Sequence, residues 1–406
     1  MKVLFPYAYF YPEVCAGLFI ADDVMHELAK EGAYSLLICP TPSRNVPKDQ
    51  MWNKDEFQEG EKIHIHRFRM YKEGKNPLAR ALRYLLCECM QLHYMLWKKY
   101  DVAFIDSTPP IQGLKLPLVR LFKNTPIVYN AQDIFPDSLV GTGLTEQGSL
   151  IWKIGRFVEK ITYKYSDKII VISQDFKKNL LSKGVPEGKI EVVYNWVDET
   201  AVVDIPRSEN KLFDKYGLDR SKFYITYNGN IGLTQNMDML LEVAKALEAN
   251  EEIQFVLVGN GAYLEDVKRI IAERNVQNVT LLPFQPYEDI SHVFSLGDVS
   301  LVISKPGVGA NSVPSKTWSI MSASRPVLAN FDENELKTII EKNICGIFTK
   351  AGDKVAFTDA ILKLYNNRTL CEEMGKNGRK FVMDNLTKAV GAQKYVDVIK
   401  SVATQY

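Results

Sequence analysis

The feature that most restricts the fold of this chain is the alternation of short apolar runs with stretches of helical periodicity. Branched and aromatic residues fill the runs, whereas the stretches between them repeat apolar residues every three or four positions. This alternation is typical of βαβ units, in which helices cover a parallel sheet. The alternation extends through most of the 406 residues, and a chain of this length is too long for one ordinary core. It therefore predicts two α/β domains.

The predicted strands fall into two groups, one in each half of the chain. They are 3–8, 35–40, 63–68, 102–106, 127–131 and 168–173, and then 222–229, 254–259, 279–284, 299–304, 326–330 and 346–349. The clearest helices are Phe19–Lys30, Leu78–Lys98, Met237–Ala249, Ala262–Arg274, Tyr287–Ser295, Ser315–Ser324 and Val355–Asn366. Gly32 follows the first helix and is typical of a helix C-terminus.

A polar segment separates the two halves. Residues 195–210 fit neither period and include Pro206, so we place the linker there. The predicted domains are 1–200 and 201–385, and 386–406 is a helix that we expect to pack back on the first domain.

Composition excludes several classes of protein. A formal net charge of +1 gives no general affinity for nucleic acid. No run approaches the roughly 18 apolar residues of a membrane span. Pro6 and Pro12 interrupt the apolar start, so we read it as a strand rather than a secretory leader. With six scattered cysteines, these features predict a cytoplasmic protein with reduced thiols.

Cysteine and histidine spacing gives no metal site. Cys87 and Cys89 lie two apart on a predicted helix and therefore point to different faces. His64 and His66 alternate along a strand, a pattern typical of a half-exposed face, and the histidines do not cluster in sequence. We expect no metal and no cofactor.

Glycines follow two predicted strands of the second half. Gly229 and Gly232 precede a helix, where backbone N–H groups and the helix N-terminus can bind phosphate, although a tight turn needs the same glycines. Gly259 and Gly261 resemble a shortened dinucleotide fingerprint or an ordinary βα turn. The missing third glycine disfavours an NAD-dependent dehydrogenase.

The strongest local signal is the loop and helix around Lys316. Gly307 and Gly309 follow a strand, and Ser315 then begins a helix that it is placed to cap. Lys316 in the first turn opposes the helix dipole, which makes sense where a pyrophosphate lies opposite it. A solvated lysine is the alternative.

In this order and spacing, the motifs resemble the retaining glycosyltransferases of family 4, which have the GT-B fold. The segments that carry the resemblance are 10–32, 132–144, 166–198, 227–247, 255–269, 281–302 and 312–329. They span nearly the whole chain and are most similar to the branch that builds bacterial surface polysaccharides and lipid-linked oligosaccharides. The resemblance implies two Rossmann-like domains with parallel sheets that face a central cleft, the first on the acceptor side and the second binding the nucleotide sugar.

The resemblance also implies roles for individual residues. Lys316 is the counter-charge of the pyrophosphate, and Gln132 and Asp133 contact the transferred sugar; these three are the candidate catalytic residues. For Asp133, capping of the turn before Pro136 is the alternative. The implied donor-binding residues are Gly17, Gly229, Asn230, Gly232, Gln235, Gly259, Gly261, Phe284, Gly309, Asn311, Ser312, Val313, Ser315 and Ser319.

Some positions depart from the family pattern. Asn311 and Ser319 stand where many members carry glutamates, and Asn230 and Gln235 stand where arginine and lysine are frequent. Gln132 replaces a histidine. These departures leave a non-catalytic relative as an alternative.

The expected reaction is retaining, metal-independent transfer of a hexosyl or N-acetylhexosaminyl group. The donor is a nucleotide-diphosphate sugar, with UDP favoured, and the acceptor is a glycan or a polyprenyl-diphosphate-linked sugar of bacterial polysaccharide biosynthesis. The alternatives are a nucleotide-sugar epimerase of the same fold and a sugar-nucleotide-binding subunit without activity.

The predicted helix 78–98 is relevant to where the protein binds its acceptor. Its apolar stripe, 78, 82, 85, 86, 89, 92, 93 and 96 with one histidine, is typical of packing against a core. Nearby Arg80, Arg83 and Lys98 leave open peripheral contact with an anionic membrane on its cytoplasmic side.

Overall fold

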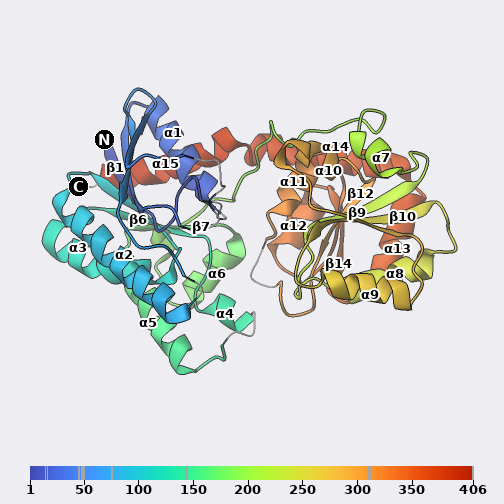
Figure 1. The fold of residues 1–406 in the computed structure, drawn as a ribbon, viewed down its shortest axis with the longest axis horizontal. Coiled ribbons are helices and arrows are strands. Elements are labelled where there is room, and N and C mark those ends of the chain that lie inside the picture. The colour runs from blue at the N-terminus through green and yellow to red at the C-terminus, as the bar shows by residue number, and fades with distance from the viewer. Residues whose placement is uncertain are drawn as a thin grey trace. The chain divides into compact units, whose positions relative to one another are not determined.

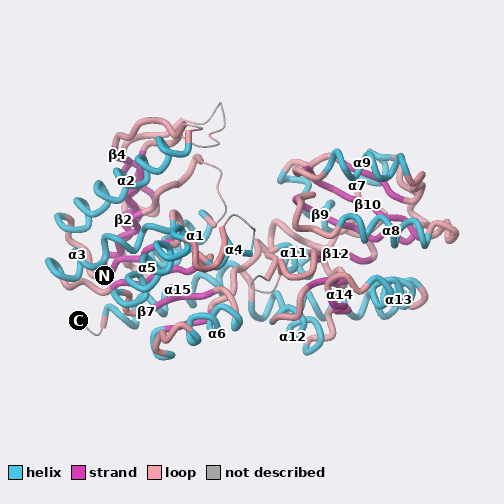
Figure 2. Tube along the Cα trace, turned by 90° about the horizontal axis from the view of Figure 1, so that it is seen from below, coloured by secondary structure: helices cyan, strands magenta, loops and turns pink. Residues whose placement is uncertain are grey.

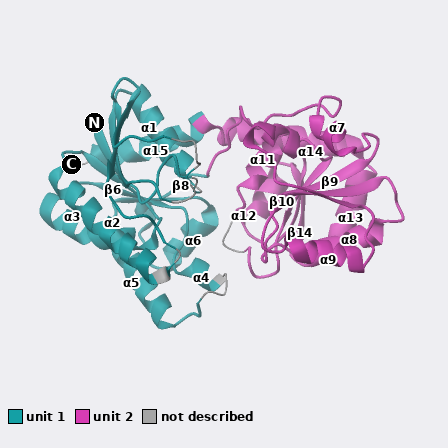
Figure 3. Ribbon diagram, in the orientation of Figure 1, with its two compact units in different colours: residues 1–194, 389–406 teal, residues 195–388 magenta. Residues whose placement is uncertain are grey.

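The computed structural model describes residues 1–13, 15, 17–43, 46, 51–74, 76–141, 145–309 and 313–404. The chain forms two compact units (Figures 1 and 3). Unit 1 comprises Met1–Tyr194 and Ala389–Tyr406, and unit 2 comprises Asn195–Lys388. Among the described helices, none combines the length and apolar content needed to cross a membrane.

The sheet of unit 1 has the strand order β3-β4-β2-β1-β5-β6-β7-β8. The strands are β1 (Lys2–Pro6), β2 (Tyr34–Pro40), β3 (Asp55–Gln58), β4 (Ile63–Phe68), β5 (Val102–Asp106), β6 (Ile127–Ala131), β7 (Lys168–Val171) and β8 (Ile190–Val192). All neighbouring pairs are parallel except β3 and β4. The sequence predicted each of these strands except β3 and β8, which are short and polar edge strands without an apolar run.

Helices cover both faces of this sheet. They are α1 (Leu18–Lys30), α2 (Pro77–Trp97), η1 (Pro110–Lys115), α3 (Leu116–Lys123), α4 (Asp137–Gly141), α5 (Leu150–Tyr165), α6 (Gln174–Ser182), η2 (Glu187–Lys189) and α15 (Lys388–Ala403). Residues of α2, α3, α5 and α6 share one core with the strands. Glu31 and Gly32 close α1 through backbone bonds to its last turn, as predicted for a glycine at this position.

The sheet of unit 2 has the order β11-β10-β9-β12-β13-β14, all parallel, which is the strand order of a Rossmann fold. The strands are β9 (Phe223–Asn230), β10 (Ile253–Asn260), β11 (Val279–Leu282), β12 (Val299–Ile303), β13 (Val327–Phe331) and β14 (Gly346–Lys350). All six were predicted. Buried runs such as VSLVI are expected where helices cover both faces of a parallel sheet.

The helices of unit 2 lie on either side of the sheet, which Figure 2 draws with strands in magenta and helices in cyan. They are α7 (Lys211–Tyr216), α8 (Met237–Leu247), α9 (Leu264–Glu273), η3 (Tyr287–Asp289), α10 (Ile290–Phe294), α11 (Lys316–Ser322), α12 (Glu335–Lys342), α13 (Lys354–Tyr365) and α14 (Arg368–Asn385). Helices α8, α9 and α13 share one core with the strands, and α7 and α10 share another.

The polar segment 195–210, expected as a linker, belongs to unit 2. The N–H groups of Val203 and Ile205 donate to the hydroxyls of Ser291 and Ser295, each at 3.0 Å. Side chains therefore pair its backbone in place of a strand ladder, which is why neither periodicity identifies it. The unit boundaries lie at 194/195 and 388/389, where the sequence had suggested 200/201 and 385/386.

Helix α15 packs on unit 1 although it follows unit 2 in the chain. The Tyr395 hydroxyl donates to Asn130 Oδ1 at 3.0 Å, and the Lys400 ammonium pairs with Glu31 at 2.6 Å. The ring of Tyr395 also contacts Phe104, with centroids 5.9 Å apart. The last helix thus completes the core of the first unit.

Both sheets reverse their strand order at one point, between β1 and β5 and between β9 and β12. In open parallel sheets, the loops at the carboxyl ends of the strands next to this switch point form the ligand site. Of the residues singled out in the sequence, Gly17 follows β1, Gly232 follows β9 and Gly309 follows β12. Gln132 and Asp133 follow β6 instead.

Prediction: Gly346→Ala destabilises unit 2. A Cβ at Gly346 would lie 2.0 Å from the carbonyl oxygen of Val327 on the neighbouring strand, so the ladder must open. We expect a loss of about 1–3 kcal/mol in urea unfolding followed by tryptophan fluorescence. Gly188→Ala is the control, because a Cβ there meets nothing within 4 Å. Equal stability of the two variants would contradict this reading.

Candidate functional site

Glycines bring the carboxyl ends of β9 and β10 into close contact. Gly229 and Gly259 are ladder partners, and a Cβ on Gly259 would lie 1.9 Å from the Gly229 carbonyl oxygen. A Cβ on Gly261 would lie 2.3 Å from the carbonyl oxygen of Ile231. Close backbone packing therefore explains Gly259 and Gly261 without a ligand.

The loop after β9 folds on its own amide side chains. Gln235 Oε1 accepts a 3.0 Å hydrogen bond from the N–H of Gly232. A Cβ on Gly232 would lie 2.6 Å from the Asn230 amide nitrogen, and one on Gly261 2.6 Å from its oxygen. Asn230, Gly232, Gln235 and Gly261 thus form one cluster at the start of the predicted phosphate loop.

Lys316 reaches this loop from the first turn of α11. Its Nζ lies 3.5 Å from where a Cβ of Gly229 would stand and 3.9 Å from the centroid of the Tyr227 ring. The Tyr227 hydroxyl donates to the carbonyl of Asn230 at 2.6 Å, which fixes the ring beneath the ammonium. The fold therefore joins Gly229 and Lys316, which are far apart in sequence, as the resemblance implies.

The Lys316 ammonium has no acidic partner among the described residues, and burial lowers its pKa to about 7. Because removal of water disfavours the charged form, an anion placed beside the ammonium would restore the charge. The position is thus prepared for a negatively charged ligand.

Buried polar atoms that have no partner among the described residues lie on the elements around Lys316. They are both amide atoms of Asn228 near the end of β9, the hydroxyl of Ser304 just after β12, and the hydroxyl of Thr317 in α11. A buried polar group without a partner is destabilising. Their presence on three converging elements indicates that a polar ligand or water completes this region.

The loop after β12 is held by residues that the sequence reading missed. Asp332 accepts from the N–H groups of Gly307 (3.0 Å) and Gly309 (2.7 Å), and Asn334 donates to the carbonyl of Gly309 at 2.9 Å. Lys305 bonds through its N–H to Thr234 at 2.8 Å and extends its ammonium over the Tyr263 ring. The sequence signal that could have identified Lys305 is its position just after β12, a strand of the switch point.

The predicted cap by Ser315 is wrong. Ser315 is already helical, with φ −59° and ψ −26°, and its side chain makes no capping bond. The Thr317 N–H instead bonds to the Pro314 carbonyl at 2.9 Å.

The remaining donor-binding candidates are dispersed over unit 2. Val313 and Ser319 are partly buried on either side of Lys316, and Phe284 is 75% exposed in the loop after β11. Asn311 and Ser312 lie outside the described residues.

In unit 1, the candidates lie on the loops after β1 and β6. Gly17 precedes α1 with φ 79°, a left-handed conformation that favours glycine. Gln132 donates to Asn130 Oδ1 at 2.8 Å and to the Tyr395 hydroxyl at 3.1 Å. Asp133 is exposed and accepts from the Ser138 hydroxyl at 2.8 Å.

Asp106 joins the same network and was not singled out from the sequence. It ends β5, accepts from Thr108 N–H (3.1 Å) and Asn130 Nδ2 (3.2 Å), and burial raises its pKa to about 6. The sequence signal that could have identified Asp106 is a carboxylate at the end of β5, a strand of the switch point. Asp106, Asn130, Gln132 and Tyr395 form one hydrogen-bonded chain at the carboxyl edge of unit 1.

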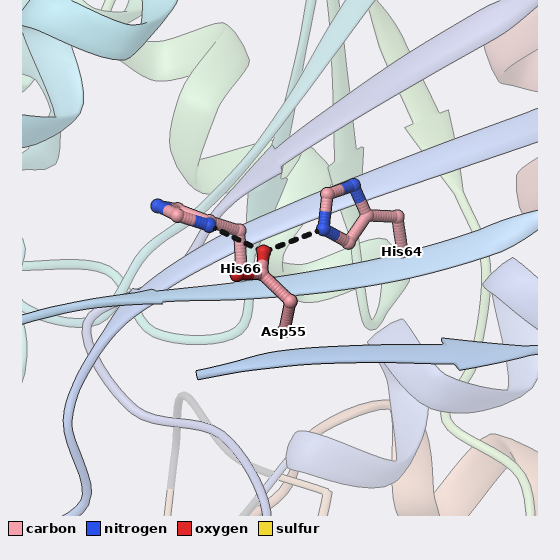
Figure 4. Close-up of side chains that lie close together, drawn as sticks. All are labelled: Asp55, His64 and His66. Carbon is pink, nitrogen blue, oxygen red and sulfur yellow. Dashed lines mark hydrogen bonds and ion pairs between the residues drawn. The ribbon is translucent and has the colours of Figure 1, made fainter. Parts of the chain in front are cut away.

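The cysteines of α2 lie as expected, but the histidines of β4 do not. Cys87 is buried and Cys89 exposed, so the cysteines do point to different faces. His64 and His66, however, converge on Asp55 (Figure 4), and the expectation that the histidines do not cluster is wrong for this pair. The third side chain of this group, Asp55, lies on β3, a strand that the sequence analysis did not identify.

Comparison with known protein families assigns both units. Residues 20–201 match the sequence profile of Glycosyltransferase Family 4, and residues 208–381 match that of Glycosyl transferases group 1. The chain is 23% identical to WbjE of Pseudomonas aeruginosa, named a probable glycosyltransferase, over 76% of each chain. It is 21% identical to the capsular polysaccharide biosynthesis glycosyltransferase CapM of Staphylococcus aureus, over 73% of this chain and 76% of CapM. A shorter match, 26% identical, covers 48% of this chain and 48% of the Escherichia coli protein WcaI.

Solved structures share the fold over the full length. Sucrose-phosphate synthase from Thermosynechococcus elongatus superposes with a TM-score of 0.75 at 14% identity, covering 100% of this chain and 99% of that one. Anabaena Alr3699/HepE in complex with UDP superposes with a TM-score of 0.72 at 15% identity, covering 99% and 100%. Since the two family profiles together span most of the sequence and the fold is GT-B, the chain belongs to the family 4 and group 1 glycosyltransferases and is itself a glycosyltransferase.

Proposed function

We propose that this glycosyltransferase moves a sugar from UDP to a glycan or lipid-linked acceptor of bacterial polysaccharide biosynthesis, with retention and without a metal ion. The observation that carries the proposal is the partly buried ammonium of Lys316 beside Gly229, which has no acidic partner among the residues that the structure describes. CapM is named for capsular polysaccharide and WcaI for colanic acid biosynthesis, and HepE is solved with UDP-glucose, which supports the acceptor and donor classes.

Lys316 would act on the leaving group. As the bond between the anomeric carbon and the β-phosphate oxygen breaks, negative charge grows on that oxygen. A fixed cation aimed at this charge stabilises the transition state more than the ground state. Lys305, whose backbone N–H bonds to Thr234 in the loop after β9, would add a second positive charge.

The chemistry of the groups around Lys316 supports the proposal of metal independence. Mg²⁺ prefers carboxylate and carbonyl oxygens together with phosphates. The described groups nearest Gly229 and Gly232 are an ammonium and the amides of Asn230 and Gln235. A cation in this position supplies the charge that a metal would otherwise provide.

Retention is proposed from the resemblance to family 4. The acceptor oxygen attacks on the face from which the diphosphate leaves, and its proton passes to the departing β-phosphate oxygen. Gln132 and Asp133 would contact the transferred sugar. In unit 1, Gln132 is oriented by Asn130 and Tyr395, so its position depends on the C-terminal helix.

The acceptor side carries a surface suited to lipid. Helix α2 has its apolar stripe outside: Leu78, Leu82, Leu85 and Leu86 are 80%, 54%, 51% and 41% exposed. The expectation that this stripe packs against the core is therefore wrong for these four leucines, whereas Leu92 in the same stripe does pack against the core. The inward side instead carries polar Glu88 and Gln91, which bond to the buried Lys115 ammonium, together with Cys87 and Met95.

Two neighbouring helices extend this surface. Helix α3 packs against both α2 and α5, and we call the surface formed by α2, α3 and α5 the three-helix face. Its exposed apolar side chains are Leu78, Leu82, Leu85, Leu86, Met90, Trp97, Leu118, Leu121, Phe122, Leu150, Ile151, Ile154 and Phe157. An apolar patch of this extent marks an interaction surface.

The charges on the three-helix face indicate an anionic bilayer as its partner. The acidic residues of these helices, Glu88 and Glu159, are buried in ion pairs with Lys115 and Lys183. Lys153, Lys160 and Lys164 remain exposed on α5. Basic residues beside aromatic and aliphatic side chains favour binding to anionic lipids.

Prediction: Lys316→Ala lowers glycosyl transfer by about 10²-fold or more, because it removes a fixed charge from the leaving group. A radiolabelled sugar transfer assay measures the loss. Lys268→Ala is the control, since Lys268 is exposed on α9 and pairs with Glu265. Near-normal turnover of Lys316→Ala would remove this residue from the mechanism.

Prediction: UDP affinity falls as pH rises above about 7. The pKa of Lys316 is lowered to about 7, so the free protein loses this charge above that pH and binding must take up a proton. Calorimetry at pH 8 in buffers of different ionisation enthalpy should detect the uptake. Lys316→Arg stays charged and serves as the control for titration of the ligand. A wild-type protein whose binding takes up no proton at pH 8 refutes the assignment.

Prediction: Leu121→Glu combined with Phe157→Glu abolishes flotation with phosphatidylglycerol vesicles at low salt, because both side chains lie on the exposed three-helix face. Ile344→Glu with Val355→Glu, two exposed apolar positions of unit 2, is the matched control and should float like the wild type. Failure of the wild type to float would overturn membrane contact without affecting the donor site.

A further inference from the structure

The hairpin at the edge of the unit 1 sheet places three metal-binding side chain types on one face. Strand β3 runs antiparallel to β4, with Asp55 opposite His66 and Phe57 opposite His64. Directly opposed residues project to the same side of a sheet, and so do residues two apart on one strand. Asp55, His64 and His66 therefore share a face by register.

Their ligand atoms converge closely. Asp55 Oδ1 lies 2.8 Å from His64 Nε2 and 2.7 Å from His66 Nδ1, and the three atoms all lie within 4.8 Å of one another. Figure 4 shows both rings directed at the same carboxylate oxygen. This oxygen and the two ring nitrogens supply ligands of a single cluster.

Neighbouring aromatic residues hold the two rings in place. His66 Nε2, the nitrogen that faces away from Asp55, lies 2.9 Å from the Tyr94 hydroxyl on α2. The Phe57 ring stacks on His64, with centroids 4.4 Å apart and an interplanar angle of 18°. A hydrogen bond to the second nitrogen is the usual support of a metal-binding histidine, because it fixes the tautomer and the ring orientation.

We propose that Asp55, His64 and His66 bind one Zn²⁺ ion, with water as the fourth ligand. Two imidazoles and a carboxylate form a ligand set that zinc accepts in tetrahedral geometry. Each ligating nitrogen must carry no proton, so a neutral His66 binds as the tautomer whose Nε2–H donates to Tyr94, and a neutral His64 binds as the Nδ1–H tautomer. Zinc bonds of about 2.0–2.1 Å separate tetrahedral ligands by about 3.3 Å. The cluster must therefore widen by about 0.5 Å, which the partly exposed Asp55 side chain allows.

The ion would clamp the edge strand and take no part in sugar transfer. In the order β3-β4-β2-β1-β5, the cluster lies at the outer edge and away from the switch point between β1 and β5. On the opposite side of the hairpin, Arg67 pairs with Glu56 at 2.8 Å, so β3 is already tied to β4 there. Zinc would add a second tie on the His64 side and, through Tyr94, connect the hairpin to α2.

Zinc binding to the full-length, tag-free protein tests the proposal. After treatment with a chelator and dialysis, calorimetric titration with ZnCl₂ should give one equivalent bound. His66→Ala and Asp55→Ala should each weaken binding at least about 10-fold, and Tyr94→Phe about 10-fold through loss of the outer hydrogen bond. His93→Ala, an exposed histidine of α2 outside the cluster, and Cys89→Ser, an exposed thiol, should bind like the wild type.

Two further readouts separate binding from folding defects. Co²⁺ in place of zinc should give the visible absorption of a four-coordinate site in the wild type and lose it in His64→Ala, while circular dichroism shows both proteins folded. Zinc should raise the melting temperature of the wild type and leave that of His66→Ala unchanged. Substoichiometric zinc in the wild type, or unaltered affinity in folded His66→Ala, would overturn the site.

Discussion

The close approach of β9 to β10 is the constraint on which the donor-binding region depends. A Cβ on Gly259 would clash with the carbonyl oxygen of Gly229, and the ammonium of Lys316 lies on the open side of Gly229. Tyr227 beneath that ammonium is anchored to Asn230 and supplies an aromatic face but no negative charge. Among the described residues the cation therefore has no counter-ion, and it gains most from a ligand that brings phosphate.

The two units handle charge in opposite ways at their switch points. Unit 2 presents a lysine whose pKa burial lowers, whereas unit 1 presents Asp106, whose pKa burial raises. Asp106 is linked through Asn130 to Gln132 and to Tyr395 of α15. Helix α15 thus helps to order the loop for which sugar contact is proposed, without itself being proposed to contact the substrate.

Alternation of apolar runs predicted the buried strands well because a covered parallel strand must be apolar on both faces. It failed for β3 and β8, which lie at the sheet edge and carry charged residues such as Asp55 and Glu191. The outward stripe of α2 was misread for a related reason. Periodicity reports that a helix has an apolar face, but it does not report what covers that face.

The sequence by itself determined that the chain forms two α/β units with parallel sheets, that glycine-rich turns follow their strands, and that Lys316 is a candidate site residue. These features follow from local conformational rules and residue order. Tertiary structure alone decided that Lys316 lies over Tyr227 and that Asp106 is linked through Asn130 to Gln132. It also decided that His64 and His66 meet Asp55. Each of these depends on strand register and helix packing between distant segments, and no local pattern encodes the distance between two side chains brought together by folding.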